Sequence, residues 1–157
     1  MLNRQGYEVT TYRVDGEYED GRHPKSVDFT TSLLEDLKRR DFTINAMAYN
    51  GREGLVDAFG GMKDLENRVI RCVGSAVNRF TEDALRILRA VRFSAQLDFR
   101  IEDETYEAIS LIAPNLEKVS KERIATELTK LLLSGHPEKM KRVSDTGASP
   151  LYLGAIF

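Results

Sequence analysis

The sequence predicts an α+β fold with a mixed first part, residues 1–74, followed by an all-α second part, residues 75–157. Short runs of β-forming residues, separated by glycine-bearing turns, occupy the first part and are typical of short strands. After Gly74 the apolar residues recur every three or four positions, which is the spacing of an amphipathic helix. We therefore expect two units that differ in secondary structure.

The composition of the 157 residues is that of a soluble globular protein, with 41% hydrophobic residues, 31% charged residues and a net charge of −2. These values argue against a disordered chain, and no apolar run approaches the roughly 20 residues that a membrane helix needs. The single cysteine, Cys72, excludes an internal disulfide and agrees with a reducing, cytoplasmic location. One cysteine and two histidines are too few for a structural zinc site.

The first part is expected to begin with a strand, a loop and a helix. Residues 7–14 alternate and are rich in β-formers, so they predict a strand, and residues 15–26 predict a long exposed loop. Ser32 and Glu35 have the spacing of a capping box, which predicts a short helix starting near Leu33.

Further elements follow in order along the chain. Residues 46–50 and 55–61 predict two short extended pieces around a glycine-bearing turn, and residues 67–73 predict another strand. Ser120 is a predicted N-cap, and Pro114 separates two of the helical segments. The segments with helical periodicity are residues 78–97, 102–113, 120–135 and 137–147.

The first helical segment carries a stripe of charge. On a helical wheel its apolar residues Ala84, Leu85, Ile87, Leu88 and Val91 lie on one side, and Arg79, Asp83, Arg86 and Arg89 lie opposite. A solvated face with an Asp83–Arg86 ion pair would explain this pattern. The stripe has three arginines and no lysine, however, and arginine is favoured where forked donors meet phosphates or base edges.

Asp83 and Arg86 together have a specific chemical capability. A carboxylate only accepts hydrogen bonds and a guanidinium only donates them. Cytosine and adenine both present an exocyclic amine next to an unprotonated ring nitrogen, whereas guanine and uracil present a carbonyl next to a ring N–H. The pair could therefore accept C and A and reject G and U, which would leave buried groups unpaired.

Three segments closely resemble motifs of the tRNA nucleotidyltransferases, the CCA-adding enzymes, whose class includes the bacterial poly(A) polymerases. The segments are Arg39 to Ala48 (RRDFTINAMA), Asp57 to Gly61 (DAFGG) and Arg79 to Phe93 (RFTEDALRILRAVRF). The resemblance runs from Tyr7 to about Leu133. It implies a partial nucleotidyltransferase head of the polymerase-β type in residues 1–74, and a helical neck in residues 75–157.

The resemblance also implies site residues. Arg40 matches the arginine that contacts the nucleotide, and Asp83 and Arg86 match the protein template that reads the base of incoming CTP or ATP. Arg89 and Arg92 match further nucleotide-binding arginines, although Arg92 lies away from the charged stripe on the wheel.

Other motif positions have two interpretations each. Asp41 and Asn45 match motif positions, and local hydrogen bonds at the head–neck junction would equally explain them. Glu8 resembles the third active-site carboxylate of the superfamily, and it is also what the solvent side of an alternating strand would carry.

One part of the family pattern is missing. The Gly-Gly signature and the Asp-x-Asp strand, which hold two Mg²⁺ ions in the family, should precede Tyr7 and do not occur in this chain. Phosphoryl transfer in this superfamily depends on such metal ions. We therefore expect a fragment that is inactive by itself, with no metal ligand beyond Glu8.

The parent activity implied by the resemblance is addition of CCA to tRNA 3′ ends from CTP and ATP. The alternatives are a poly(A) polymerase and a non-catalytic RNA- or nucleotide-binding module. The partners implied are the tRNA 3′ end, CTP and ATP, with no membrane. An unpaired strand edge would in addition invite pairing with a second chain.

The loop at residues 15–26 has a role of its own in the family. Relatives that add only the two cytidines lack a flexible loop at this place. The resemblance therefore implies that the loop helps the template switch from C to A, whereas its composition alone indicates an ordinary surface loop.

Overall fold

The computed structural model describes residues 6–17 and 26–143. Its strands are β1 (Arg13–Asp15), β2 (Val27–Phe29), β3 (Ala48–Asn50), β4 (Gly54–Val56), β5 (Val69–Ile70) and β6 (Arg100–Ile101). Its α-helices are α1 (Leu33–Lys38), α2 (Gly61–Glu66), α3 (Ala76–Glu82), α4 (Leu85–Leu97), α5 (Asp103–Ile112), α6 (Lys121–Leu132) and α7 (Met140–Val143). Three 3₁₀ turns, η1 (Thr43–Asn45), η2 (Ala113–Lys118) and η3 (Pro137–Lys139), complete the described part.

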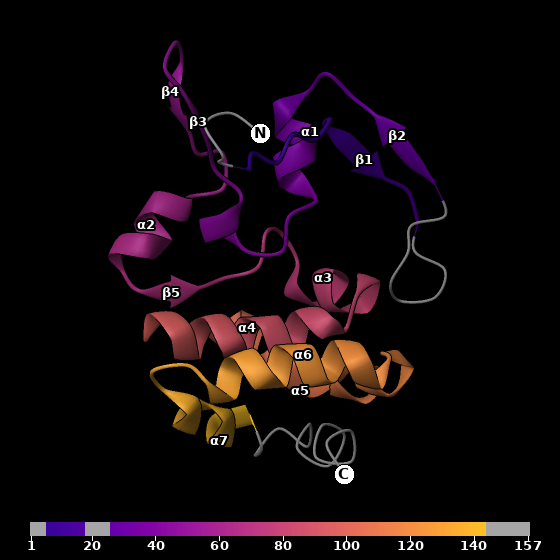
Figure 1. The fold of residues 1–157 in the computed structure, drawn as a ribbon, viewed down its shortest axis with the longest axis vertical. Coiled ribbons are helices and arrows are strands. Elements are labelled where there is room, and N and C mark those ends of the chain that lie inside the picture. Colours follow the sequence, from indigo (N-terminus) through magenta and orange to yellow (C-terminus); the bar gives the residue numbers. More distant parts are fainter. Residues whose placement is uncertain (1–5, 18–25, 144–157) are drawn as a thin grey trace.

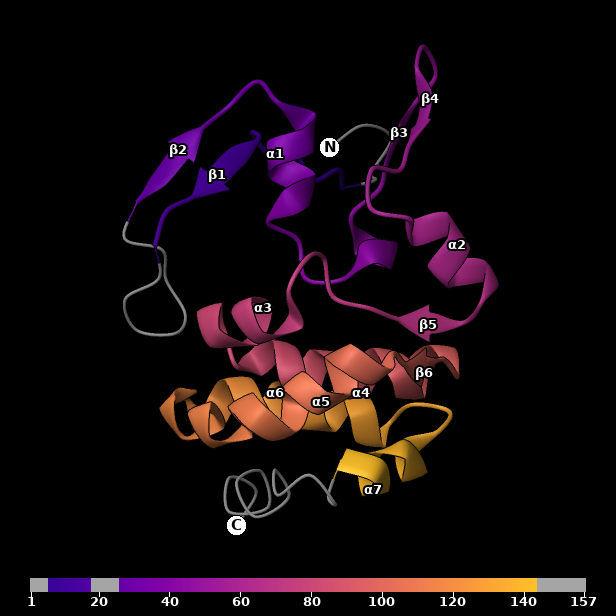
Figure 2. The ribbon, with the colours of Figure 1, turned by 180° about the vertical axis from the view of Figure 1, so that it is seen from behind.

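The elements form two layers, and the predicted α+β class is confirmed (Figure 1). Strands β1 to β5 lie with α1 and α2 on one side, and helices α3 to α7 form the other. Helix α6 faces the viewer in Figure 1, and α5 faces the viewer from behind in Figure 2. No helix in the described ranges is long and apolar enough to cross a membrane.

The strands pair in three small sheets. β1 pairs antiparallel with β2, and β3 with β4, so the predicted extended pieces around the 51–54 turn are confirmed. β5 pairs in parallel with β6, which lies after α4. The helical part thus contributes a two-residue strand, β6, which the sequence did not indicate. The strand forms because Asp98, at φ 55°, turns the chain back beside Arg68.

The predicted strand at residues 7–14 is shorter than expected. Only Arg13 and Val14 of that segment are in β1, whose register continues to Asp15. Its ladder is limited by β2, which the sequence did not predict and which spans only three residues. Most of the loop predicted at 15–26, including its middle, lies outside the described residues.

Two helix starts were predicted correctly. The Ser32 hydroxyl accepts the N–H of Glu35 at 3.4 Å, which begins α1 as predicted. Ser120 is the N-cap of α6 as predicted. Helix α2 was not predicted. The Asp57 carboxylate starts it by accepting the N–H groups of Gly61 and Met62 at 2.7 and 2.9 Å.

The helix predicted across residues 78–97 is broken in the middle. Asp83 has an extended backbone, with φ −150° and ψ 103°, between α3 and α4. Its carboxylate accepts the N–H of Leu85, the first residue of α4, at 3.1 Å. A short acidic side chain that bonds the backbone two residues on favours a helix start over a helix interior.

One hydrophobic core joins both parts of the chain. Phe42 and Ile70 from the first part belong to the same buried cluster as Phe80, Ile87 and Ile109 from the helices. The apolar side of the predicted wheel is confirmed, because all its members are buried. Its members are Ala84, Leu85, Ile87, Leu88 and Val91. The shared core holds α4 against Phe42, which follows the end of α1 by four residues.

Candidate nucleotide-binding site

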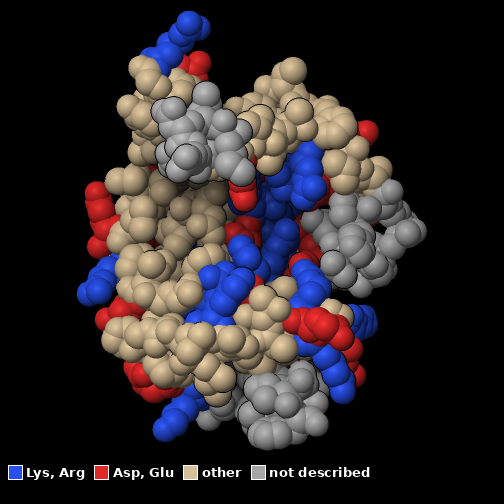
Figure 3. All heavy atoms as spheres, in the orientation of Figure 1, with Lys and Arg blue, Asp and Glu red and all other residues tan. Residues whose placement is uncertain are grey.

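A hollow of about 450 Å³ lies where the end of α1 meets the start of α4. Lys and Arg side chains gather along the middle of this face between the two layers (Figure 3). The hollow is lined by Arg39, Arg40, Asp41, Asn45, Asp83, Leu85, Arg86, Arg89 and Arg123. Five arginines stand against two aspartates in this lining, so the hollow attracts anions.

The last turn of α1 and the residues after it supply one wall. Arg39 and Arg40 both bind the carboxylate of Asp36, with Nη2 atoms at 2.9 and 3.0 Å from its two oxygens. Asp36 is buried, whereas the Arg40 side chain is 42% exposed. Burial acts to raise the pKa of Asp36, but hydrogen bonds from Arg40 and Arg39 outweigh it and lower the pKa. The carboxylate is therefore ionised at neutral pH.

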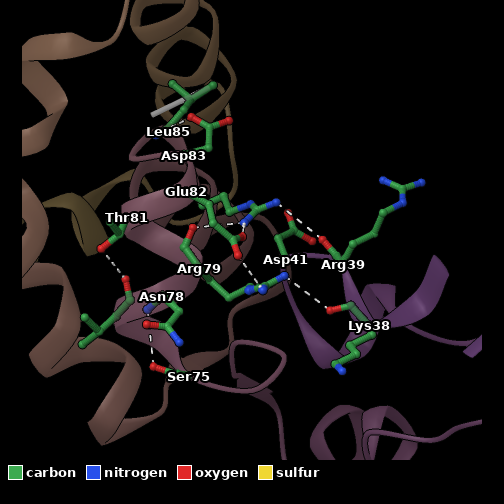
Figure 4. Close-up of polar contacts among 12 residues, drawn as sticks. Lys38, Arg39, Asp41, Ser75, Asn78, Arg79, Thr81, Glu82, Asp83 and Leu85 are labelled. Carbon is green, nitrogen blue, oxygen red and sulfur yellow. Dashed lines mark hydrogen bonds and ion pairs between the residues drawn. The ribbon is translucent and has the colours of Figure 1, made fainter. Parts of the chain in front are cut away.

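Two arginines of the helical part hold the end of α1, and Figure 4 shows one of them, Arg79, directed at Lys38. Arg79 donates to the carbonyl of Lys38 at 3.3 Å, and Arg86 donates to the carbonyl of Arg39 at 3.5 Å. The Glu82 carboxylate binds both Arg79 and Arg86, at 2.6 and 2.5 Å. The last carbonyls of a helix lack partners within it and carry partial negative charge, so cations at this end are favoured.

The Asp83 carboxylate is held by Arg123, which lies on α6. Its Oδ2 lies 2.7 Å from Nη2 of Arg123 on α6, and its Oδ1 lies 3.3 Å from Nη1. Oδ1 also accepts the N–H of Leu85, whereas Oδ2 accepts only from Arg123, and because a carboxylate oxygen has two lone pairs Oδ2 keeps the capacity for a further donor. Arg123 was not singled out from the sequence.

Asp41 and Asn45 make the junction bonds that one interpretation expected. Arg89 on α4 donates to Asp41 Oδ2, and Asn45 donates to Asp41 Oδ1 at 3.2 Å. The backbone N–H of Phe42 also donates to Oδ1, at 2.9 Å. Asp41 therefore ties α4 to the chain that leaves α1.

The structure brings four of the six predicted site residues together. Arg40, Asp83, Arg86 and Arg89 all line the hollow, although Asp83 precedes α4 rather than lying within one continuous helix. The Asp83 carboxylate pairs with Arg123, and the Arg86 guanidinium pairs with Glu82. These two contacts stand in place of the i,i+3 pair between Asp83 and Arg86 that the solvated-face interpretation would require.

Arg92 and Glu8 lie elsewhere. Arg92 is 8% exposed and binds Glu127 on α6 at 2.5 Å and Gln96 at 2.8 Å. Its guanidinium also lies 4.0 Å from the centre of the Phe93 ring. Glu8 is exposed and belongs to no strand.

Three positions around the hollow were missed in the sequence. Asp36 and Glu82 were not separated from ordinary charged residues of their helices, and Arg123 lies 40 positions from its partner Asp83. For Asp36, the local signal was the pair of consecutive arginines at 39 and 40, which need a carboxylate partner.

The carboxylates of the described residues do not form a magnesium site. Among residues 6–17 and 26–143, no three His, Cys, Asp or Glu side chains gather to hold a metal ion. Two-metal catalysis needs several carboxylates around two ions. The residues described here thus do not fit the two Mg²⁺ ions of the family, and no step is assigned to a metal.

Two family models match the chain. Residues 1–71 match the "Poly A polymerase head domain", and residues 98–149 match the "Probable RNA and SrmB- binding site of polymerase A". The CCA-adding enzyme of Streptococcus thermophilus is 56% identical over 139 residues, which is 88% of this chain and 35% of that protein. The chain belongs to the family of tRNA nucleotidyltransferases and poly(A) polymerases.

Other members of this family agree in sequence and fold. The CCA-adding enzyme of Oceanobacillus iheyensis is 54% identical over 86% of this chain and 34% of its own length. The Bacillus stearothermophilus CCA-adding enzyme in complex with CTP has a TM-score of 0.83 and 43% identity, over 93% of this chain and 35% of that one. The Thermotoga maritima CCA-adding enzyme complexed with tRNA has a TM-score of 0.68 and 38% identity, over 74% of this chain and 30% of that one. The chain thus spans about a third of the length of the curated relatives it matches.

Proposed function

We propose that this chain is the nucleotide-recognition part of a tRNA nucleotidyltransferase that adds CCA to tRNA 3′ ends from CTP and ATP. The observation that carries the proposal is that Arg40, Asp83, Arg86 and Arg89 line one arginine-rich hollow. Relatives with 54–56% identity are CCA-adding enzymes, and related structures contain CTP, ATP or tRNA. The partners proposed are therefore the tRNA 3′ end and these two nucleotides, in the cytoplasm.

Base selection is assigned to Asp83 and Arg86. The Asp83 carboxylate accepts from the exocyclic amine of C or A, and the Arg86 guanidinium donates to the adjacent ring nitrogen. Arg123 holds the carboxylate and Glu82 holds the guanidinium, so neither group must be ordered at the moment of binding. G and U would put a carbonyl against the carboxylate and a ring N–H against the guanidinium, and like groups would face each other.

The triphosphate is assigned to Arg40 and Arg89 on opposite walls. Arg40 follows α1, and Arg89 lies one turn along α4 from Arg86. Guanidinium groups match phosphate oxygens in bidentate geometry. Arg92 is proposed to act only indirectly, because its guanidinium is engaged with Glu127 and Gln96 away from the hollow.

Transfer requires more than the described residues. We propose Mg²⁺ as the metal of the complete protein, held mainly by carboxylates outside the described residues, with Glu8 as the candidate ligand among residues 6–17 and 26–143. The 157-residue chain itself is proposed to bind nucleotide without transferring it.

A poly(A) polymerase is the second candidate, because both family models take their descriptions from that enzyme. The test is incorporation of labelled CMP and AMP by the full-length protein, with a tRNA that ends before CCA as the primer. CCA addition gives two C and one A and then stops, whereas a poly(A) polymerase adds a run of A without C. Incorporation of neither nucleotide by the full-length protein would leave a non-catalytic binding module.

A further inference from the structure

Asp36 is a buried carboxylate behind the wall of the hollow. It is 3% exposed and is not among the residues that line the hollow. Its Oδ1 accepts from Nε and Nη2 of Arg39 at 3.1 and 2.9 Å, and from the backbone N–H of Arg13 at 3.2 Å. Its Oδ2 accepts from Nη2 of Arg40 at 3.0 Å. One carboxylate thus joins β1 to two consecutive arginines.

Arg40 is only partly used by this contact. A guanidinium has five N–H donors, and one hydrogen bond joins Arg40 to Asp36. Its Nε is buried without a hydrogen-bond partner among the described residues. The rest of the side chain is accessible, since it is 42% exposed and lines the hollow, so the remaining Nη donors are the ones that a ligand in the hollow can meet.

The charges around Asp36 leave the wall positive. Asp36 neutralises one of the two guanidinium groups that it binds, whereas Arg86 and Arg89 on the facing wall each have a carboxylate partner of their own, Glu82 and Asp41. The pKa of Asp36 is lowered, because the bonds from Arg40 and Arg39 outweigh the effect of burial, so the carboxylate stays charged at neutral pH.

We infer that Asp36 is a positioning residue for nucleotide binding, which acts by holding the Arg40 guanidinium against the wall so that its remaining donors meet the triphosphate. The inference rests on the proposed function, since it takes a nucleotide as the ligand of the hollow. Asp36 touches no ligand itself, and its effect passes through Arg40.

A charge effect and a positioning effect predict opposite changes in CTP affinity when Asp36 loses its charge. Removal of a negative charge beside a positive hollow strengthens its attraction for a triphosphate, if charge alone matters. Loss of the bond that holds Arg40 weakens binding, if position matters. The sign of the change in CTP affinity therefore separates a positioning residue from a mere countercharge.

The experiment is calorimetric titration of the 157-residue chain with CTP. We expect Asp36→Asn to weaken CTP binding roughly tenfold, the size that follows from one charged hydrogen bond. Glu35→Gln is the matched control, because it removes one negative charge from the neighbouring position of α1 without a contact to Arg40. The control should stay within about twofold of the unaltered chain.

A double-variant cycle shows whether Asp36 acts through Arg40. Arg40→Ala should weaken CTP binding, and adding Asp36→Asn to it should change the affinity little further, since coupled residues are not additive. Fully additive effects, or unchanged or tighter CTP binding by Asp36→Asn, would overturn the inference. Absence of CTP binding by the unaltered chain would overturn the proposed function as well.

A second measurement does not depend on the fold of any variant. In the unaltered chain, ¹⁵N NMR of the arginine side chains should show slow rotation of the Arg40 guanidinium, because Asp36 holds its Nη2. A freely rotating Arg40 in the folded, unaltered chain would overturn the inference.

Discussion

The guanidinium of Arg89 on α4 binds the Asp41 carboxylate, with Nε and Nη2 lying 2.7 and 2.6 Å from Oδ2. Asp41 is almost buried and follows α1, so this contact crosses from the helical layer to the mixed part. The geometry is that of a charge-assisted hydrogen bond. An arginine proposed to meet the triphosphate is thus held by the opposite wall before any ligand arrives.

Asp41→Asn should destabilise the fold, because Arg89 loses the countercharge that the buried Asp41 carboxylate supplies. Hydrogen bonds to charged groups contribute about 1.5–3 kcal/mol, and a loss of that size in the free energy of unfolding is expected. Urea unfolding of both chains measures it. Asp28→Asn, an exposed change on β2, is the control, and an equal effect of the two substitutions would contradict the role of Asp41.

Four of the residues that line the hollow were singled out from the sequence, whereas their partners were not. The charged stripe pointed to Asp83, Arg86 and Arg89, because residue type and helical spacing are local signals, and the family resemblance pointed to Arg40. The bond from Arg123 to Asp83 depends on how α6 packs against α4, which no local pattern records. Tertiary packing thus sets the partners of these side chains, and spacing along one helix does not predict them.

The secondary structure also contains elements that local sequence predicts and elements that it does not. Ser32 and the apolar side of α4 gave correct elements, since each relies on contacts within one or two turns. The break at Asp83 escaped notice because the surrounding residues favour helix by propensity. β2 and β6 escaped because strands of two or three residues are defined by their partners rather than by their own composition.

Asp83→Ala should cost base discrimination more than triphosphate affinity. Loss of one member of a bidentate reading pair typically costs about 1–3 kcal/mol of discrimination. The measurement is incorporation of CMP and AMP against UMP and GMP by the full-length protein. Arg123→Ala is the informative comparison, because it breaks the same ion pair and keeps the acceptor.

The two variants give a clear contrast. We expect Arg123→Ala to lower stability while it retains more discrimination than Asp83→Ala. Equal loss for all four nucleotides with Asp83→Ala would make Asp83 a structural partner of Arg123 and nothing more.

Arg92 and Glu127 should matter for stability rather than for nucleotide binding. Both side chains are nearly buried, and breaking such a pair by removing one partner costs about 3–5 kcal/mol. Glu127→Ala should therefore lower the free energy of unfolding by an amount of that order. Replacing both, as Arg92→Met with Glu127→Leu, should recover much of the loss, since no buried charge is left unpaired.

CTP titration of the double variant then tests the role that the family resemblance gave to Arg92. We expect CTP affinity close to that of the unaltered chain, because Arg92 does not line the hollow. A tenfold weaker affinity in a folded double variant would restore Arg92 to the binding residues.

Cys72 should be unreactive in the folded chain. Its side chain lies in the core beside Phe42, and burial raises the pKa of its thiol to about 12. Because the thiolate is the reactive form, alkylation by iodoacetamide at pH 8 should be far slower than in urea. Alkylation at the same rate with and without urea would show that this part of the core opens freely.

The raised pKa of Cys72 also predicts how the free energy of unfolding changes with pH. An unfolded thiol with an ordinary pKa near 9.0 releases its proton before the folded one, whose pKa is about 12. The unfolded chain thus binds fewer protons between these values, and stability falls as pH rises, by about 1.4 kcal/mol per unit from this group. Below pH 9 the contribution of Cys72 is fully present. The Cys72→Ala chain lacks this group, so its free energy of unfolding should fall less steeply between pH 9 and 12, and identical slopes for the two chains would contradict the raised pKa.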